Sequence, residues 1–494
     1  MLEASALPTT TTEPPQACFI GNAWVDGESD HVIAVEDPAT EELIAGFNAA
    51  SVTQTDDALR VAREAFDRGI WSRRTPLERS NALHQLADRF ERDAARFADM
   101  LVAEIGSPTQ LVRGVQVDCA IELLRWFADA AARGPRQGFE EVLPVHRRPV
   151  ASRSVLLSEP AGVVAGITAY NFPLLLLIRK IGGALAAGCT TVVMPSPRAP
   201  LSTIEFMRLL AETDIPPGAV NLVVGGPEVG MRLTTSPMVD MITFTGSRAV
   251  GQAVMVQAAA GIKKVVLELG GKSANIVLPG ANVEGAVRPS LLRFSLNAGQ
   301  ACGATTRTFV PRADYERYVE ESQRTLAELV VGDPRDPATV VGPLIRGDHR
   351  ASVQGYIDRA IDAGATVEAS AAVAEQRGHY VAPQLIGNVS NHSEISREEL
   401  FGPVGVIMPF DSVDEAIAMA NDSRFGLNAN IWGPHSEAIE VARHLRTGNV
   451  TINGGGGGRQ DVPWGGYGES GIGKEAGEAG YLEFFEFKHV QWPV

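Results

Sequence analysis

One cysteine stands in a setting that suits nucleophilic chemistry. The stretch 294–302 ends in Cys302, which follows the pair Gly299-Gln300 after one alanine. A cysteine attacks a carbonyl as its thiolate, and a glycine-containing turn can present the sulfur to a cleft beside backbone N–H groups. The alternative is a buried thiol that packs as a small hydrophobic side chain, as most free cysteines do. The nucleophile is favoured because parts of the same active site lie elsewhere in the chain.

Three further motifs accompany this cysteine. They are Ala-Tyr-Asn-Phe-Pro at 169–173, Leu-Glu-Leu-Gly-Gly-Lys at 267–272 and Glu-Glu-Leu-Phe-Gly-Pro at 398–403. In this order and at these spacings the four motifs resemble the NAD(P)-dependent aldehyde dehydrogenase superfamily. The resemblance extends from about residue 22 to the C-terminus.

The resemblance implies a division of catalytic roles. Cys302 would add to the aldehyde carbonyl, and the Asn171 side-chain amide and the Cys302 backbone N–H would hold the oxyanion, which needs fixed donors. Hydride would leave to the nicotinamide, and Glu268 would be the base for thioester hydrolysis. The leucines beside Glu268 predict a half-buried strand that raises its pKa, although an edge-strand surface carboxylate is the alternative. Lys180 matches a proton-relay lysine of the family, and the alternative is a lysine on an amphipathic helix face. For Asn171 the alternative is a side chain that caps a loop.

The substrate pocket is implied by the same resemblance. Its positions are Tyr170, Phe172, Leu176, Arg179, Ala301, Gly303 and Trp464. Arg179-Lys180 resembles the pair of succinate-semialdehyde dehydrogenases, in which the arginine binds a carboxylate, and relatives that act on uncharged aldehydes share this pair. Trp464 stands where the family has phenylalanine. The glycines at 454–458 stand at the substrate-covering loop and predict a mobile, open rim.

The cofactor side lacks the G-x-G-x-x-G fingerprint after every expected strand. Instead, the strand at 241–244 is followed by Gly246 and by Ser247, a good helix cap, and a helix N-terminus attracts phosphate. A plain strand–turn–helix cap is the alternative. The resemblance implies cofactor contacts by Ser196, Phe244, Gly246, Ser247, Gly251, Glu399 and Phe401. Met194 and Pro197 depart from the family, so NAD and NADP both stay open, with NAD slightly favoured.

The elements that would position these residues alternate along the chain. Apolar residues at three- and four-residue spacing predict helices at 56–66, 76–104 and 115–132. Short buried strands are expected at 163–167, 190–194, 220–224 and 241–244, with helices between them. This alternation predicts a parallel, doubly wound sheet, and a second series follows from 273 to about 451.

The expected fold class is α/β, with two doubly wound α/β domains and a small β-arm for oligomerisation. The expected domain bounds are 1–16 for a flexible lead-in, 17–139 with 160–268 for the cofactor-binding domain, 269–453 for the catalytic domain, 140–159 with 482–494 for the arm, and 454–481 for a substrate-covering and C-terminal segment. The arm follows from the family resemblance, which implies a homodimer or homotetramer.

Composition narrows the partners. The chain has 494 residues and a formal net charge of -16. Its fractions of hydrophobic (45%) and charged (21%) residues are those of an ordinary globular protein. The negative charge argues against nucleic acid or an anionic membrane surface as a partner, and no apolar run is long enough to span a bilayer. The four scattered cysteines predict no disulfide framework and no metal site, and a reducing cytoplasm suits a catalytic thiol. The expected partner is a small-molecule aldehyde.

Two other functions compete with an aldehyde dehydrogenase that releases an acid. In a CoA-acylating dehydrogenase a thiol takes the acyl group, and such relatives usually lack a base at the position of Glu268. A non-catalytic binding protein that reuses the fold would be expected to lose Cys302, Asn171 or Glu268, and all three are present.

Overall fold

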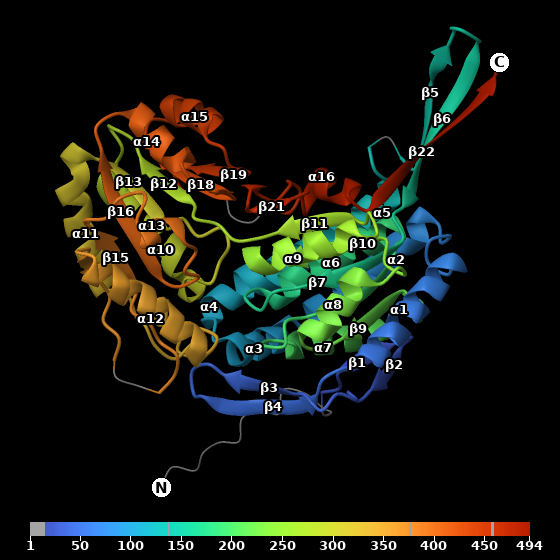
Figure 1. The fold of residues 1–494 in the computed structure, drawn as a ribbon, viewed down its shortest axis with the longest axis horizontal. Coiled ribbons are helices and arrows are strands. Elements are labelled where there is room, and N and C mark those ends of the chain that lie inside the picture. The colour runs from blue at the N-terminus through green and yellow to red at the C-terminus, as the bar shows by residue number, and fades with distance from the viewer. Residues whose placement is uncertain (1–14, 137, 375–376, 456–458) are drawn as a thin grey trace.

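The computed structural model describes residues 15–136, 138–374, 377–455 and 459–494. Two α/β bodies lie side by side, and a three-stranded arm projects from one of them (Figure 1). Each body has its own hydrophobic core. The predicted α/β class with two sheet domains and an arm is confirmed. The predicted lead-in at 1–16 lies outside the described residues except for 15 and 16, and the domain boundaries remain our proposal.

The first sheet has eight strands in the order β2-β1-β9-β8-β7-β10-β11-β21. Its central pairs from β9 to β11 are parallel, and β1 and β21 join it antiparallel. The strands are β1 Cys18–Ile20, β2 Ala23–Val25, β7 Val163–Ile167, β8 Thr190–Met194, β9 Val220–Val223, β10 Met241–Thr245, β11 Lys264–Glu268 and β21 Gly471–Ile472. Parallel strands end at one edge, where ligands of open α/β sheets bind.

Helices cover both faces of this sheet (Figure 1). They are α1 Val52–Asp67, α2 Pro76–Arg92, α3 Ala94–Ile105, α4 Thr109–Leu111, η1 Val112–Asp118, α5 Cys119–Arg133, α6 Pro173–Ala187, α7 Leu201–Ala211, α8 Pro227–Thr235 and α9 Arg248–Ala259. The predicted single helix at 76–104 is wrong, because the backbone leaves helical geometry at Asp93 (ψ 8°). The break lets Phe90 of α2 meet Phe97 of α3 edge to face, with ring centroids 5.0 Å apart.

The second sheet has seven strands in the order β14-β15-β16-β13-β12-β18-β19, parallel except for β14 with β15. The strands are β12 Ala274–Val277, β13 Arg307–Pro311, β14 Thr366–Ser370, β15 Gln384–Gly387, β16 Val404–Phe410, β18 Asn428–Trp432 and β19 Asn449–Ile452. Its helices are α10 Val283–Ser295, η2 Leu296–Gly299, η3 Arg312–Asp314, α11 Tyr315–Ala327, α12 Gly347–Asp362, α13 Glu394–Arg397, α14 Val413–Asn421 and α15 His435–His444. The elements outside the two sheets, their helices and the arm are β3 Val32–Asp37, β4 Glu42–Asn48, β17 Phe425–Gly426, β20 Tyr467–Gly468 and α16 Gly477–Leu482.

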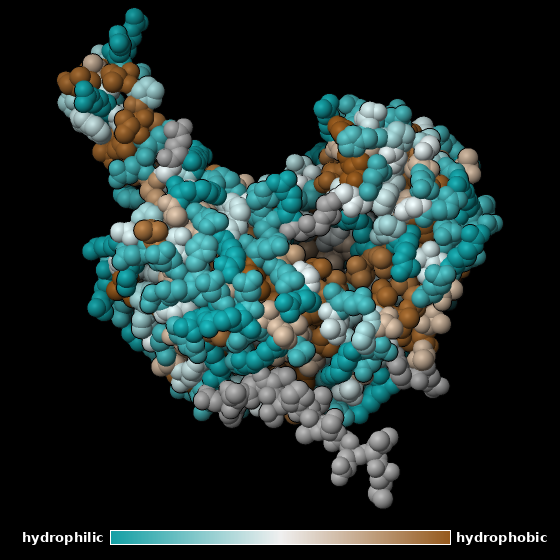
Figure 2. Space-filling model, turned by 180° about the vertical axis from the view of Figure 1, so that it is seen from behind, coloured by the Kyte–Doolittle hydropathy of each residue, from teal (hydrophilic) through white to brown (hydrophobic). Residues whose placement is uncertain are grey.

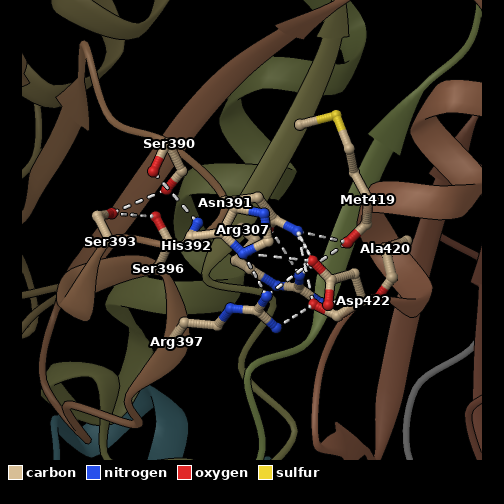
Figure 3. A network of polar contacts seen from close by, with 10 residues as sticks. All are labelled: Arg307, Ser390, Asn391, His392, Ser393, Ser396, Arg397, Met419, Ala420 and Asp422. Atoms are coloured by element: carbon tan, nitrogen blue, oxygen red, sulfur yellow. Dashed lines mark hydrogen bonds and ion pairs between the residues drawn. The ribbon is translucent and has the colours of Figure 1, made fainter.

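A buried arginine of the second body holds the segment that follows β11 in place. Arg307 at the start of β13 donates to the carbonyl oxygens of Lys272, Met419 and Ala420, and to Asn391. Figure 3 shows Asn391, Met419 and Ala420 around its guanidinium. Because a buried charged donor must be satisfied, this network fixes the backbone at Lys272, just beyond the Glu268 strand.

The arm is an antiparallel sheet of β5 Glu140–His146, β6 Ser152–Pro160 and β22 Phe485–Pro493, in the order β22-β6-β5. It joins segments more than 300 residues apart, with Phe485 paired to Pro160 and Pro493 to Ser152. Hydrophobic side chains gather on it (Figure 2), including Val142, which is 82% exposed, and Trp492. In the part of the chain that the structure describes, no helix is long and apolar enough to cross a membrane.

Candidate active site

One cavity of about 1130 Å³ collects most of the predicted site residues. Cys302, Glu268 and Asn171 line it, together with Ser196, Phe244, Gly246, Ser247, Glu399 and Phe401 from the predicted cofactor set, and with Tyr170, Phe172, Leu176, Arg179, Ala301, Gly303 and Trp464 from the predicted substrate set. Two predicted residues do not line it. Gly251 lies inside α9, where Leu269 fills the space that a side chain would need, and Lys180 is buried behind the wall.

The loop before Cys302 is a tight turn stabilised by hydrogen bonds of the Gln300 side chain. Asn297, Ala298 and Gly299 all have positive φ values of 55°, 53° and 73°. A side chain at Gly299 would also lie 2.1 Å from the backbone of Gly402, so the position requires glycine on two counts. The Gln300 side chain donates to the Asn297 carbonyl and accepts the Ile345 N–H at 3.0 Å. The turn therefore fixes the direction in which the following thiol points.

The Cys302 side chain is half-buried and forms no disulfide with the other described residues. Burial raises the pKa of Cys302 well above its ordinary value, and the negative charge of Glu268 adds to this effect. A group that accepts the thiol proton must therefore accompany attack by the sulfur.

Asn171 joins the two halves of the site. It follows β7, and its side-chain Nδ2 donates to the Gln300 carbonyl at 2.9 Å, two residues before the thiol. Asn297 donates in turn to the Asn171 carbonyl at 3.1 Å. An amide nitrogen carries two N–H donors, so one of them remains for an oxygen beside Cys302.

Glu268 is buried at the end of β11, which is paired on both sides and is not an edge strand. Its Oε1 accepts the indole N–H of Trp464 at 2.9 Å, and its Oε2 is buried with no hydrogen-bond partner among the described residues. Burial raises the pKa of Glu268 to about 8, and Glu475 adds to the rise, whereas Arg179 and the Trp464 hydrogen bond lower it. A carboxyl with this pKa is suited to accept a proton near neutral pH.

An ionic cluster lies behind Glu268 and was not predicted from the sequence. Glu475 is buried and pairs with Lys180, and its Oε2 lies 3.7 Å from Arg179. Burial lowers the pKa of Lys180, and the Glu475 carboxylate opposes that fall. Lys180 and Glu475 are 295 positions apart, so neither periodicity nor a local motif signals the contact.

The cofactor side lies at the carboxyl ends of β8, β7 and β10, which are neighbours in the sheet. Ser247 caps α9 by accepting the Val250 N–H. Thr168 and Thr245, at the ends of β7 and β10, line the cavity with buried Oγ1 atoms that have no partner among the described residues. Buried polar atoms of this kind call for a polar ligand, which a dinucleotide would supply.

The second body contributes the opposite wall. Burial raises the pKa of Glu399 to about 7, and its Oε1 accepts the Gly271 N–H at 3.0 Å. Phe401 has a positive φ of 55°, and its carbonyl lies 2.7 Å from Nε2 of His349. Sequence reasoning missed His349, which lines the cavity and carries no motif of its own.

The fold and cavity together define an α/β enzyme site with a thiol, a high-pKa carboxyl and a polar strand-end cleft. The aldehyde dehydrogenase family model matches residues 24–490. The chain is 38% identical over 480 residues to a 3-succinoylsemialdehyde-pyridine dehydrogenase of Pseudomonas sp, covering 96% of this chain and 97% of the relative. It is 35% identical over 481 residues to the betaine aldehyde dehydrogenase of Bacillus subtilis, with the same coverage.

Solved structures agree with the sequence relatives. A mutant of aldehyde dehydrogenase C from Pseudomonas syringae, in complex with NAD⁺ and octanal, superimposes with a TM-score of 0.92 at 35% identity, covering 97% of each chain. The chain described here belongs to the aldehyde dehydrogenase family.

Proposed function

We propose that the protein oxidises an aldehyde to a carboxylic acid, with NAD or NADP as hydride acceptor. The observation that carries this proposal is that Cys302, Asn171 and Glu268 line one cavity. A family likeness alone would give only the class of enzyme. The arrangement of these three residues supports the reaction itself.

The chain's residues and solvent water exchange the protons of the reaction. The thiol proton passes to water in the cavity as the Cys302 sulfur bonds to the carbonyl carbon, and the resulting oxyanion lies between an Asn171 side-chain N–H and the Cys302 backbone N–H. The bound nicotinamide supplies the acceptor for the departing hydride. A water then gives one proton to Glu268, its hydroxide adds to the acyl carbon, and the C–S bond breaks. Cys302 leaves as a thiolate and regains a proton from solvent, and Glu268 returns its own proton to solvent.

The cofactor wall fits a dinucleotide but does not select between its two forms. Met194 is buried and packs beside Gly230, where its thioether sulfur would lie 3.5 Å from a side chain at that glycine. A thioether cannot donate the hydrogen bonds that a lysine there would give to a ribose. NAD remains slightly favoured, as in the NAD⁺ complex of the Pseudomonas syringae relative.

A substrate panel with both cofactors tests the proposed function. Formation of reduced nicotinamide with release of a free acid, without added coenzyme A, is the expected result. A requirement for coenzyme A would favour the acylating alternative, and no turnover with any aldehyde would favour a binding protein. Glu268 at the position of a hydrolytic base favours the free acid.

Arg179 gives a prediction about substrate charge. Its guanidinium lines the cavity, and its buried Nε has no hydrogen-bond partner among the described residues. If it anchors a carboxylate, succinate semialdehyde is preferred over butanal, and Arg179→Ala lowers that preference by about 1.5–3 kcal/mol, the range for a charge-assisted bond. The ratio of the two kcat/KM values measures this effect. An unchanged ratio would leave a general aldehyde dehydrogenase.

Cationic aldehydes are expected to be poor substrates. The Arg179 guanidinium carbon lies 5.3 Å from the centre of the Trp464 ring, so the aromatic face that would attract a quaternary ammonium is already occupied by a cation. Betaine aldehyde, the substrate named for the Bacillus subtilis relative, should therefore show a lower kcat/KM than an uncharged aldehyde of similar size. An equal or higher value would contradict this assignment of the ring face.

The arm supports a homo-oligomer of two or four subunits. It exposes Val142, Phe487 and Trp492, an apolar surface of the kind that marks a protein interface. Val142→Lys with Trp492→Lys should lower the mass measured by light scattering to that of a smaller assembly. The same double lysine change at Val32 and Leu43, exposed on the β3–β4 hairpin, serves as control and should leave the mass unchanged.

We also propose that the protein acts in a reducing cytoplasm, because that compartment would keep the Cys302 thiol active.

A further inference from the structure

A hydrogen bond from Trp464 reaches the proposed base directly. The indole Nε1 donates to Glu268 Oε1 at 2.9 Å, while Glu268 Oε2 has no hydrogen-bond partner among the described residues. The phenylalanine found at this position in the family has no N–H and could not make the bond. The contact is therefore particular to a chain with tryptophan here.

The indole is held on several sides. The Trp464 backbone exchanges two hydrogen bonds with Glu475, of 2.6 and 2.7 Å. The Arg179 cation lies over the ring, and the ring edge fills the space beside Gly303, where a side chain would lie 2.9 Å from it. Because rotation of the ring would lose these contacts together, the N–H keeps its direction toward Glu268.

Charged groups surround Glu268 from several elements. The ionisable groups that interact electrostatically with the Glu268 carboxyl are Arg179 and Lys180 from α6, Cys302 from its loop, and Lys474 and Glu475 from the C-terminal segment. The cations and the Trp464 N–H favour the carboxylate, and burial and Glu475 favour the protonated acid. Trp464 is the neutral donor in this set, so its bond can be removed without changing any charge.

We propose that Trp464 is a positioning residue for thioester hydrolysis: its indole N–H anchors one oxygen of the Glu268 carboxylate and leaves the other to accept the proton of the attacking water. This inference rests on the proposed role of Glu268. Hydroxide from that water adds to the acyl carbon, the C–S bond breaks, and the proton stays on Glu268 Oε2 until solvent takes it.

The test is Trp464→Phe, with the rate constant of thioester hydrolysis measured by rapid mixing from pH 6 to pH 10. Loss of a hydrogen bond to the charged form raises the pKa of Glu268, so the acid limb should move to higher pH by about one unit. Hydrolysis at pH 7 then falls about tenfold and recovers above the new pKa, whereas the hydride-transfer burst is retained. Trp71→Phe, which removes an indole N–H bonded to the Leu185 carbonyl at 2.9 Å in the core, is the matched control and should not move the limb.

The double variant Glu268→Gln with Trp464→Phe separates the two proposals. Trp464→Phe should add nothing to Glu268→Gln, because the group on which it acts is gone. An unmoved limb, an equal loss at every pH, or a further loss in the Glu268→Gln background would overturn the role of Trp464. Normal hydrolysis in Glu268→Gln alone would instead overturn the proposed base. If Trp464→Phe does not fold, benzothienylalanine at 464 keeps the bicyclic shape, replaces N–H by sulfur and allows the same measurements.

Discussion

Cys302→Ala is expected to abolish aldehyde oxidation and any esterase activity, with a loss on the order of 10⁴-fold or more, because the covalent intermediate forms on the Cys302 sulfur. The half-buried side chain contributes little to the core, so the melting temperature and cofactor binding should stay near those of the unaltered protein. Stopped-flow absorbance of reduced nicotinamide and ester hydrolysis give the two rates.

Cys119→Ala is the matched control for this experiment. Cys119 is another thiol on the cavity wall, and no catalytic role is assigned to it. It should retain activity within about a few-fold, as surface-lining changes usually do. Turnover well above background in Cys302→Ala would remove the assignment of the nucleophile. Asn171→Ala combined with Cys302→Ala should lose little beyond the single thiol change, since both serve one oxyanion.

Glu268→Gln is expected to slow thioester hydrolysis about 10²- to 10⁴-fold, the range for general base catalysis, and to slow hydride transfer much less. Rapid mixing should show a burst of reduced cofactor followed by a slow steady state. A burst that slows in parallel with turnover would show that Glu268 is not chiefly the hydrolytic base.

The pH dependence of hydrolysis follows from the raised pKa of Glu268. The base acts as carboxylate, and burial raises its pKa to about 8, so the hydrolysis rate should rise with pH and level off above pH 8. In Glu268→Gln that rise should disappear, because the amide does not titrate. A rise that persists with the same midpoint would assign it to another group.

The family resemblance predicted which residues of the four motifs would line the site. Glycine at 299 behind Cys302, asparagine after the first parallel strand, and glutamate closing a leucine-flanked strand could all be found without coordinates. Strand–helix alternation likewise predicted the two sheets, because a parallel strand that is buried on both faces consists almost entirely of apolar residues. The break at Asp93 could not be found, because the apolar spacing continues through it and only the packing of Phe90 against Phe97 shows the turn.

The sequence by itself determined which residues can take part in the chemistry and how strands and helices follow one another along the chain. The tertiary structure alone decided the environment of those residues: that burial raises the pKa of Cys302, that Glu475 lies near both Lys180 and Arg179, and that Trp464 donates to Glu268. These contacts join residues about 200 to 300 positions apart. Their energies depend on burial and on distances of a few ångströms, which only the packing of the C-terminal segment against the first sheet sets.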